Sequence, residues 1–365
     1  MDKIINIFTV RNIRFTIVYF TRIFIFAIIS FLVLTLSIET GNSSENIKLN
    51  VCATITDLGD IVSNIGGSAV NVTVFAKATE DPHFVEAKPG FIKSLSEADL
   101  LVISGMELES GWLPVLINNC RNAKIQNSGP GYVDCSKAIE PLEIPASAID
   151  RSMGDVHPNG NPHYLLDPLN GAKAAELIKE KLCELLPSQK KTFEENYAEF
   201  IKKLGAVIFG TELSEKYDFI KLIKLNENGK LLDFLKSQND DSKLGGCLGK
   251  LLPYSGTKIV DDHNMWIYFA NRFGFVVTGH MEEVPGVPPA TKTIRLLSEK
   301  MKAEGIKIIL TSAYYDSRHA DALSKITGAN VCRLANLTGS RNGAGTYIQM
   351  IEYNAATILQ FLNNK

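Results

Sequence analysis

The sequence predicts an α/β protein of two lobes, each a mostly parallel sheet flanked by helices, joined by one long, rigid helix. Two observations support this fold class. Short apolar segments alternate with helical segments in both halves of the 365-residue chain, and a long helical region separates the halves. Parallel strands need a crossover connection of a dozen or more residues, usually a helix, so this alternation is typical of parallel sheets. The chain is also long enough for two cores.

The elements follow in order. In the first half of the chain, the pattern predicts strands over 48–54, 71–77 and 99–104, and helices over 57–65, 90–98 and 109–120. The second half predicts strands over 258–261, 274–278, 306–311 and 330–334, with helices over 263–273, 291–303, 318–327 and from about residue 346. Helix stops such as Gly66-Gly67 support these boundaries.

The pattern in the middle of the chain predicts the helix that connects the two lobes. Residues 171–204 are helical apart from a break at Leu186-Pro187-Ser188, and the second part carries apolar residues at helical spacing, namely Phe193, Tyr197, Phe200, Ile201 and Leu204. We therefore predict an N-terminal lobe over 46–186, a connecting helix over 187–205 and a C-terminal lobe over 206–365. Within the second lobe, 206–256 is rich in Lys, Asp, Asn and Gly, which predicts a peripheral insertion of irregular structure.

The first 45 residues differ in composition from the rest. Four basic residues precede the apolar run 23–38, which then gives way to polar residues. This order is typical of an export signal and predicts a periplasmic or extracytoplasmic protein. The alternative is an uncleaved membrane anchor over 15–38. No cysteine closely follows the apolar run, so a bacterial lipoprotein is not predicted.

Charge and cysteine content narrow the partners. The net charge is −2 and no basic stripe appears, so binding to nucleic acid is not predicted. We expect the protein to be a monomer. The six cysteines form no CxxC pair, which argues against a thiolate zinc site. Two of them, Cys52 and Cys332, lie in apolar strands, where buried free thiols are expected.

Three of the six histidines have similar surroundings. Each of His83, His163 and His263 follows a turn-forming or apolar stretch and precedes a predicted helix. His83 and His263 come after predicted strands, and ligands collect beyond the carboxyl ends of parallel strands. A single histidine is more often a surface or core residue than a ligand, but three in matching settings predict a nitrogen-rich metal site between the lobes.

The other three histidines carry weaker signals. His157 lies in the same Pro-Gly-Asn-rich loop as His163, where it would assist metal capture, although solvent exposure is the stronger expectation. His280 is a second candidate near the site, and His319 is expected on a solvated helix face. Asp167 is expected to cap a helix and to orient His163 as a partner carboxylate.

From residue 48 onward the chain resembles the metal-specific solute-binding proteins of ABC importers, which supply zinc or manganese to a membrane permease. The most specific segment is Asn161-Pro162-His163-x-x-x-Asp167-Pro168. The resemblance also rests on 80–83, 262–270, 273–275, 285–289 and 306–315. It implies that the three matching histidines bind metal, and that a rigid helix joins lobes which close little around the ion.

The chain departs from this family at the fourth ligand. The family often has a carboxylate where Ser312 or Asn336 stands here. Glu282 is therefore our predicted fourth ligand. Asp316 and a water molecule are alternatives, and each carboxylate also has a structural interpretation. Three imidazoles suit tetrahedral zinc, whereas manganese prefers more oxygen, so zinc is predicted with manganese as the alternative.

These observations predict an exported, high-affinity zinc receptor that delivers its ion to an ABC permease and is not an enzyme. A zinc-dependent hydrolase with a water molecule in an open position is one alternative, although no HExxH or comparable spacing supplies its general base. A metal-binding adhesin is the other alternative.

Overall fold

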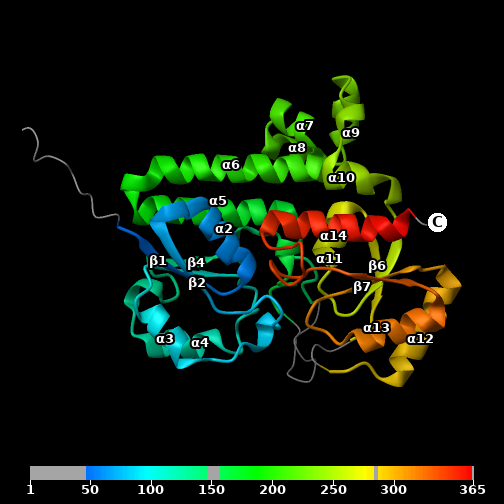
Figure 1. The fold of residues 1–365 in the computed structure, drawn as a ribbon, viewed down its shortest axis with the longest axis horizontal. Helices are drawn as coiled ribbons and strands as arrows, with labels where there is room; N and C mark the ends of the chain where they lie inside the picture. Colours follow the sequence, from blue (N-terminus) through cyan, green and yellow to red (C-terminus); the bar gives the residue numbers. More distant parts are fainter. Residues whose placement is uncertain (1–46, 146–156, 283–286, 364–365) are drawn as a thin grey trace, which may run out of the picture. The chain divides into compact units, whose positions relative to one another are not determined.

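The first sheet has four parallel strands in the order β2-β1-β3-β4 (Figure 1). The computed structural model describes residues 47–145, 157–282 and 287–363. The strands are β1 (Leu49–Ala53), β2 (Val70–Val74), β3 (Leu100–Ile103) and β4 (Tyr132–Asp134). Every residue of β3 is buried, as expected for a parallel strand covered on both faces. β4 was not predicted from the sequence because it is only three residues long.

Helices cover both faces of this sheet. They are α2 (Thr56–Gly66), α3 (Pro89–Ser96), α4 (Leu113–Cys120) and α5 (Pro168–Leu185). In Figure 1, α2 and α5 lie on one side of the sheet and α3 and α4 on the other. α4 begins four residues later than predicted, because Gly105, Met106 and Glu107 all have positive φ and form a turn before it.

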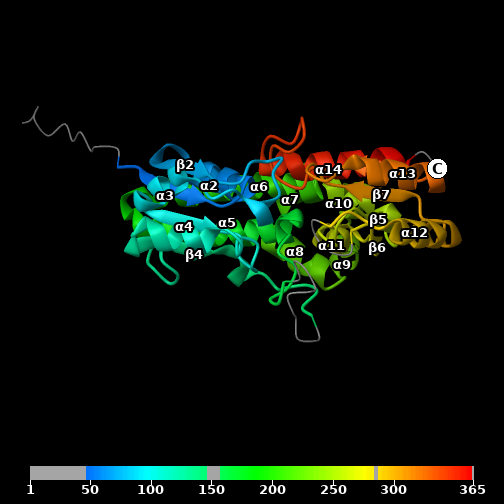
Figure 2. The same cartoon turned by 90° about the horizontal axis from the view of Figure 1, so that it is seen from below.

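The second sheet repeats this arrangement, with parallel strands in the order β6-β5-β7-β8. Its strands are β5 (Lys258–Asp261), β6 (Val276–His280), β7 (Ile308–Thr311) and β8 (Asn330–Arg333). Its helices are α11 (Ile267–Phe273), α12 (Thr291–Glu304), α13 (Ser317–Thr327) and α14 (Tyr347–Leu362). Figure 2 shows β7, β5 and β6 side by side in this order. The predicted fold class is confirmed.

The connector is α6 (Lys190–Phe209), a helix of 20 residues. It buries Phe193, Phe200 and Leu204, whereas Tyr197 and Ile201 of the predicted apolar face are only partly buried. The helix packs on α2 and α5, on α10 (Gly246–Leu251) and on α14. One apolar core continues through both sheets, from Leu49 to Leu362. A smaller core lies under α12 and α13. The lobes are therefore joined by packing as well as by chain connection.

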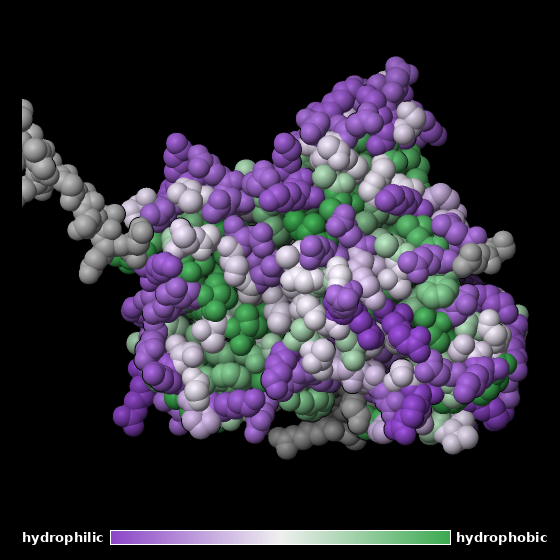
Figure 3. Space-filling view, viewed as in Figure 1, coloured by the Kyte–Doolittle hydropathy of each residue, from purple (hydrophilic) through white to green (hydrophobic). Residues whose placement is uncertain are grey.

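The prediction of irregular structure over 206–256 was wrong. This segment forms α7 (Thr211–Lys216), α8 (Phe219–Glu227), α9 (Leu231–Ser237) and α10. Asp218 caps α8 by accepting a hydrogen bond from the Lys221 N–H, and Leu222 and Leu235 are fully buried. The helices are too short to produce a clear sequence period. Figure 3 shows that the visible surface in this region is mostly hydrophilic.

Two further findings concern the sequence predictions. All six cysteines are free, and Cys52 and Cys332 are buried as expected. Among the described residues no helix is both long enough and apolar enough to cross a membrane. The predicted export signal over 1–45 lies outside the described residues.

Hydrogen bonds link α2 of the first lobe to the end of the chain. Asp60 Oδ2 accepts a hydrogen bond from the Tyr347 N–H at 2.9 Å, at the start of α14. The Tyr347 hydroxyl donates to the Leu165 carbonyl at 2.7 Å. Asp57 Oδ1 accepts from the Thr338 hydroxyl at 3.0 Å. The N-terminal end of α14 is thus fixed to the first lobe.

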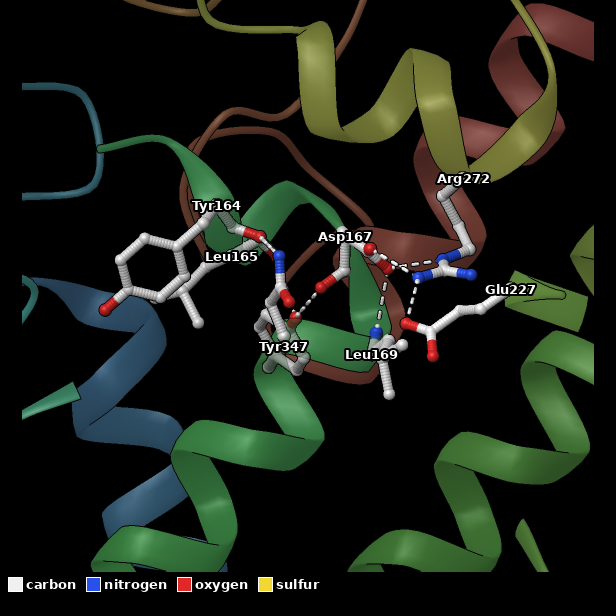
Figure 4. A network of polar contacts seen from close by, with 8 residues as sticks. Tyr164, Leu165, Asp167, Leu169, Glu227, Arg272 and Tyr347 are labelled. Carbon is white, nitrogen blue, oxygen red and sulfur yellow. Dashed lines mark hydrogen bonds and ion pairs between the residues drawn. The ribbon is translucent and has the colours of Figure 1, made fainter. Parts of the chain in front are cut away.

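A bidentate ion pair makes a second link between the lobes (Figure 4). Arg272 of α11 donates from Nε and Nη2 to the two carboxylate oxygens of Asp167, at 2.7 and 2.8 Å. Asp167 also caps α5 by accepting from the Leu169 N–H, as predicted. Glu227 lies 3.7 Å from the same guanidinium. The second predicted role of Asp167 was wrong, because its carboxylate pairs with Arg272 instead of orienting His163.

Breaking this pair is expected to destabilise the protein. The Arg272 and Asp167 side chains are only 11% and 8% exposed, so Arg272→Met leaves a buried carboxylate without its cation and costs about 3 kcal/mol. The matched control is Arg295→Met, whose pair with Glu299 is 60% and 57% exposed and contributes less than about 0.5 kcal/mol. Urea unfolding compares them; equal losses would show that the Arg272 pair does not stabilise the fold.

Candidate metal-binding site

Four histidine rings gather between the two sheets. His83 follows β2, His157 and His163 precede α5, and His263 follows β5. The ring centroids of His83 and His157, and those of His83 and His163, are 5.2 Å apart. The His163 and His263 centroids are 5.8 Å apart, and those of His83 and His263 are 6.5 Å apart. The structure therefore brings the three predicted histidines together and adds a fourth.

The expectation that His157 is solvent-exposed was wrong. Its side chain is half-buried, and its Nε2 lies 3.2 Å from Nε2 of His83. The sequence contained one signal for this, since His157 lies six residues before His163 in a loop that Pro, Gly and Asn restrict.

His83 lies in a short 3-10 turn, Pro82–Phe84, which its neighbours orient. Asp81 caps the turn by accepting from the His83 N–H at 3.0 Å, and the Trp112 indole donates to the Pro82 carbonyl at 2.9 Å. The same Asp81 oxygen lies 2.7 Å from Nδ1 of His83. A hydrogen bond from Nδ1–H to a carboxylate leaves Nε2 with its lone pair, the usual arrangement of a metal-binding histidine.

His163 is positioned by Asn161, which also reaches the second lobe. Asn161 Oδ1 accepts from the His163 N–H at 3.0 Å. Its Nδ2 donates to the Asn264 carbonyl at 2.7 Å and to Glu143 at 3.0 Å. Because Asn264 is next to His263, one amide side chain sets the segments of both histidines relative to each other.

His263 is held by a buried carboxylate. Asp262 Oδ1 accepts from the His263 N–H at 2.9 Å, and Oδ2 accepts from the Ser312 N–H and hydroxyl at 2.6 and 2.9 Å. Burial raises the pKa of Asp262 to about 7. The Tyr315 ring lies 5.6 Å from the His263 ring. Both oxygens of Asp262 therefore orient the backbone around the site.

Burial lowers the pKa of three of the four histidines. Loss of hydration, followed by the neighbouring His83, lowers the pKa of His263 to about 3 and that of His157 to about 4, and holds the pKa of His163 well below 6.5. His163 Nε2 and His263 Nδ1 are buried without a hydrogen-bond partner among the described residues. Buried nitrogens of this kind cost free energy unless a ligand binds them.

The arrangement has the right donors for a metal ion, but it is not yet a closed site. Within residues 47–145, 157–282 and 287–363, no group of three or more His, Cys, Asp or Glu side chains is placed to hold an ion as it stands. Neutral imidazole nitrogens are ligands for zinc and several other transition metals.

The remaining candidates lie around this cluster. The Glu282 N–H donates to the Asp262 carbonyl, and the Glu282 charge helps to raise the pKa of Tyr314, after burial and Asp81. His280 Nδ1 lies 2.5 Å from Asp261 Oδ1, which gives it a structural partner. No observation places Glu282 on the metal, so its role as the fourth ligand stays a prediction.

The other predicted carboxylate and its neighbours have structural roles. Asp316 caps α13 and pairs with Arg318. His319 lies on the same helix and is partly buried. At the two positions where the family often has a carboxylate, Ser312 donates to Asp262, and Asn336 Oδ1 accepts from the Ala313 N–H at 3.0 Å.

Comparison with known proteins gives consistent matches over most of the chain. Residues 51–214 and 249–361 match the family model described as zinc-uptake complex component A, periplasmic. The metal ABC transporter substrate-binding lipoprotein ScbA of Streptococcus cristatus is 25% identical over 337 residues, covering 90% of this chain and 92% of that protein. The manganese-binding lipoprotein MntA of Halalkalibacterium halodurans is 25% identical over 333 residues, covering 89% and 92%.

The solved structures agree on the fold. The crystal structure of ZnuA matches with a TM-score of 0.61 at 22% identity, covering 86% of this chain and 99% of that one. At this identity the likeness shows the fold alone. The residues between the two matched segments of the family model include α8 and α9.

The buried histidines make the metal-free protein sensitive to acid. A folded pKa far below 6.5 means that the unfolded chain binds more protons as the pH falls from 7.5 to 5.0, so folding stability is lost in this window. In the unfolded chain, one histidine with an ordinary pKa of about 6.5 gains about 2 kcal/mol from protonation between pH 7.5 and 5.0. His163→Leu removes this histidine, so the variant is expected to lose about 2 kcal/mol less folding stability over the same pH range. Carboxylates such as Asp262 are present in both the wild-type protein and the variant, so their contribution to the pH dependence cancels in the comparison.

The measurement is the free energy of urea unfolding at both pH values, with a chelator present to exclude metal. The same pH dependence in the wild-type protein and the variant would show that His163 is not held uncharged.

Proposed function

The chain belongs to the zinc-uptake complex component A family, and from this premise we propose that it is an exported zinc receptor. It is a substrate-binding protein of a metal ABC transporter and not an enzyme. Two of its relatives are named as metal or manganese ABC transporter substrate-binding lipoproteins. The ion binds between the lobes through His83, His163 and His263. The receptor acts as a monomer outside the cytoplasm and delivers the ion to an ABC permease in the membrane.

One observation carries this proposal. Three imidazoles from three distant segments meet, and two of them, His163 and His263, have a buried nitrogen with no hydrogen-bond partner among the described residues. A cluster built only for stability would pair these nitrogens, because an unpaired buried polar atom costs about 1–3 kcal/mol. A bound cation compensates that cost.

The donor set favours zinc. Imidazole nitrogens suit zinc, whereas manganese prefers carboxylate and water oxygens. The nearby carboxylates of Asp81 and Asp262 already accept hydrogen bonds from His83, His263 and Ser312. Manganese is the alternative, because several relatives are named for manganese.

The hydrogen bonds between the lobes favour local motion over wide opening. Asn161 to Asn264, Asp167 to Arg272 and Asp60 to Tyr347 tie the lobes at three places. Loading and release therefore require shifts of the histidine-bearing loops and not a hinge rotation. This mode of exchange is compatible with docking on a permease that recognises both lobes together.

Single replacement of the three histidines tests the site. His83→Ala, His163→Ala and His263→Ala are each expected to weaken zinc binding by about 100-fold or more, because each removes one metal–nitrogen bond. Competition titration with a zinc chelator measures the affinity, and His319→Ala on α13 is the matched control. Unchanged affinity in all three variants would rule out the proposed site.

Loss of the Asp81 charge, which lies beside His83, is expected to weaken zinc binding less than loss of a histidine ligand. Asp81→Asn keeps the side-chain size but loses the charge that holds Nδ1–H, so zinc affinity falls by about 10-fold. The same titration applies. A loss as large as that of His83→Ala would instead make Asp81 a direct ligand.

A further inference from the structure

We propose that His157 supplies the fourth nitrogen to the metal, so that the site holds four imidazoles and selects zinc over manganese. The inference rests on the proposed function, since it names a ligand and a selectivity for the same site. It replaces Glu282 as the fourth ligand. His157 comes from the first lobe, which would then contribute three of the four ligands.

The distance between His83 and His157 matches a tetrahedral zinc site. Zinc–nitrogen bonds of about 2.05 Å give a tetrahedron with an edge of about 3.3 Å. The two Nε2 atoms are 3.2 Å apart. The centre of an imidazole ring lies about 3.2 Å from a bound zinc, so ring centroids in such a site are about 5.2 Å apart. His83 shows this separation to both His157 and His163.

The two facing nitrogens need a cation or proton between them. Asp81 lies 2.7 Å from Nδ1 of His83, on the opposite side of the ring from Nε2. The His157 ring donates a hydrogen bond to the Met106 backbone. Each neutral ring carries one proton, so if both rings use it in these bonds, two lone pairs face each other. A shared cation turns this repulsion into coordination.

The backbone beneath His157 is built for a fixed geometry. Met106 and Glu107 have φ of 49° and 62°, a left-handed conformation that non-glycine residues adopt rarely and that clusters at functional sites. The Asn159 side chain donates to the Glu107 carboxylate. The Asn161 N–H donates to the Leu142 carbonyl at 2.9 Å. The segment that carries His157 is therefore anchored at two further residues.

The described arrangement is more open than a closed tetrahedral site. The His83 and His263 centroids are 6.5 Å apart, about 1.3 Å more than the 5.2 Å of a closed tetrahedral site. The His163 and His263 centroids are 5.8 Å apart, which is also more than about 5.2 Å. Closure of the site therefore requires the histidine-bearing loops to move inward, with the His263 ring moving toward His83 by about an ångström.

The test compares His157→Ala with His157→Asp, and uses Glu282→Gln as the rival ligand. Zinc and manganese affinities come from competition titration, and the visible absorption of bound Co²⁺ reports tetrahedral geometry. His157→Ala is expected to weaken zinc binding by about 10- to 100-fold and to reduce the Co²⁺ band. His157→Asp is expected to shift preference toward manganese, because a carboxylate oxygen is a harder ligand.

The outcomes separate this inference from the proposed function. If His83→Ala loses zinc while His157→Ala keeps both affinity and the Co²⁺ band, the fourth-ligand role is wrong and the receptor function stands. A loss of affinity in Glu282→Gln alone assigns the position to Glu282. If neither His83→Ala nor His157→Ala changes zinc affinity, both proposals fail. Thermal unfolding of each metal-free variant confirms that it folds.

Discussion

The side-chain amide of Asn161 is the contact on which the histidine cluster depends. Its oxygen accepts from the His163 N–H, and its nitrogen donates across the lobes to the carbonyl of Asn264. A planar amide has fixed donor and acceptor directions, so these two bonds set the distance between the two histidine-bearing segments. Glu143 bridges the side chains of Asn161 and Asn264 and reinforces the same register.

The distance between the two histidine-bearing segments stays fixed only if the lobes do not move relative to each other. α6 and α14 both contact α2 of the first lobe, and one apolar core continues through both sheets. The Asp167–Arg272 pair adds a directional link close to the start of α5. Packed interiors resist small displacements, so this packing holds the two lobes in a fixed relative position.

The sequence predicted the fold class and three histidines for a physical reason. Parallel strands covered on both faces are continuous apolar runs, and His83 and His263 follow two of them. The burial of His157 was not predicted, because it depends on a contact with His83, 74 residues away. Arg272 was missed for the same reason, since its partner Asp167 is 105 residues distant. The short helices over 211–251 were missed because each offers too few turns for a period.

The carboxylates around the cluster explain why nitrogen is the donor that remains. Asp81 is engaged by the His83 ring and backbone, and Asp262 accepts three hydrogen bonds from His263 and Ser312. Asp261 is occupied by His280 through Oδ1. A carboxylate that already accepts hydrogen bonds must give them up before it coordinates metal, and the freed donors would then be buried without partners. The acidic side chains around the cluster therefore act as hydrogen-bond acceptors that orient the histidines and the backbone beside them.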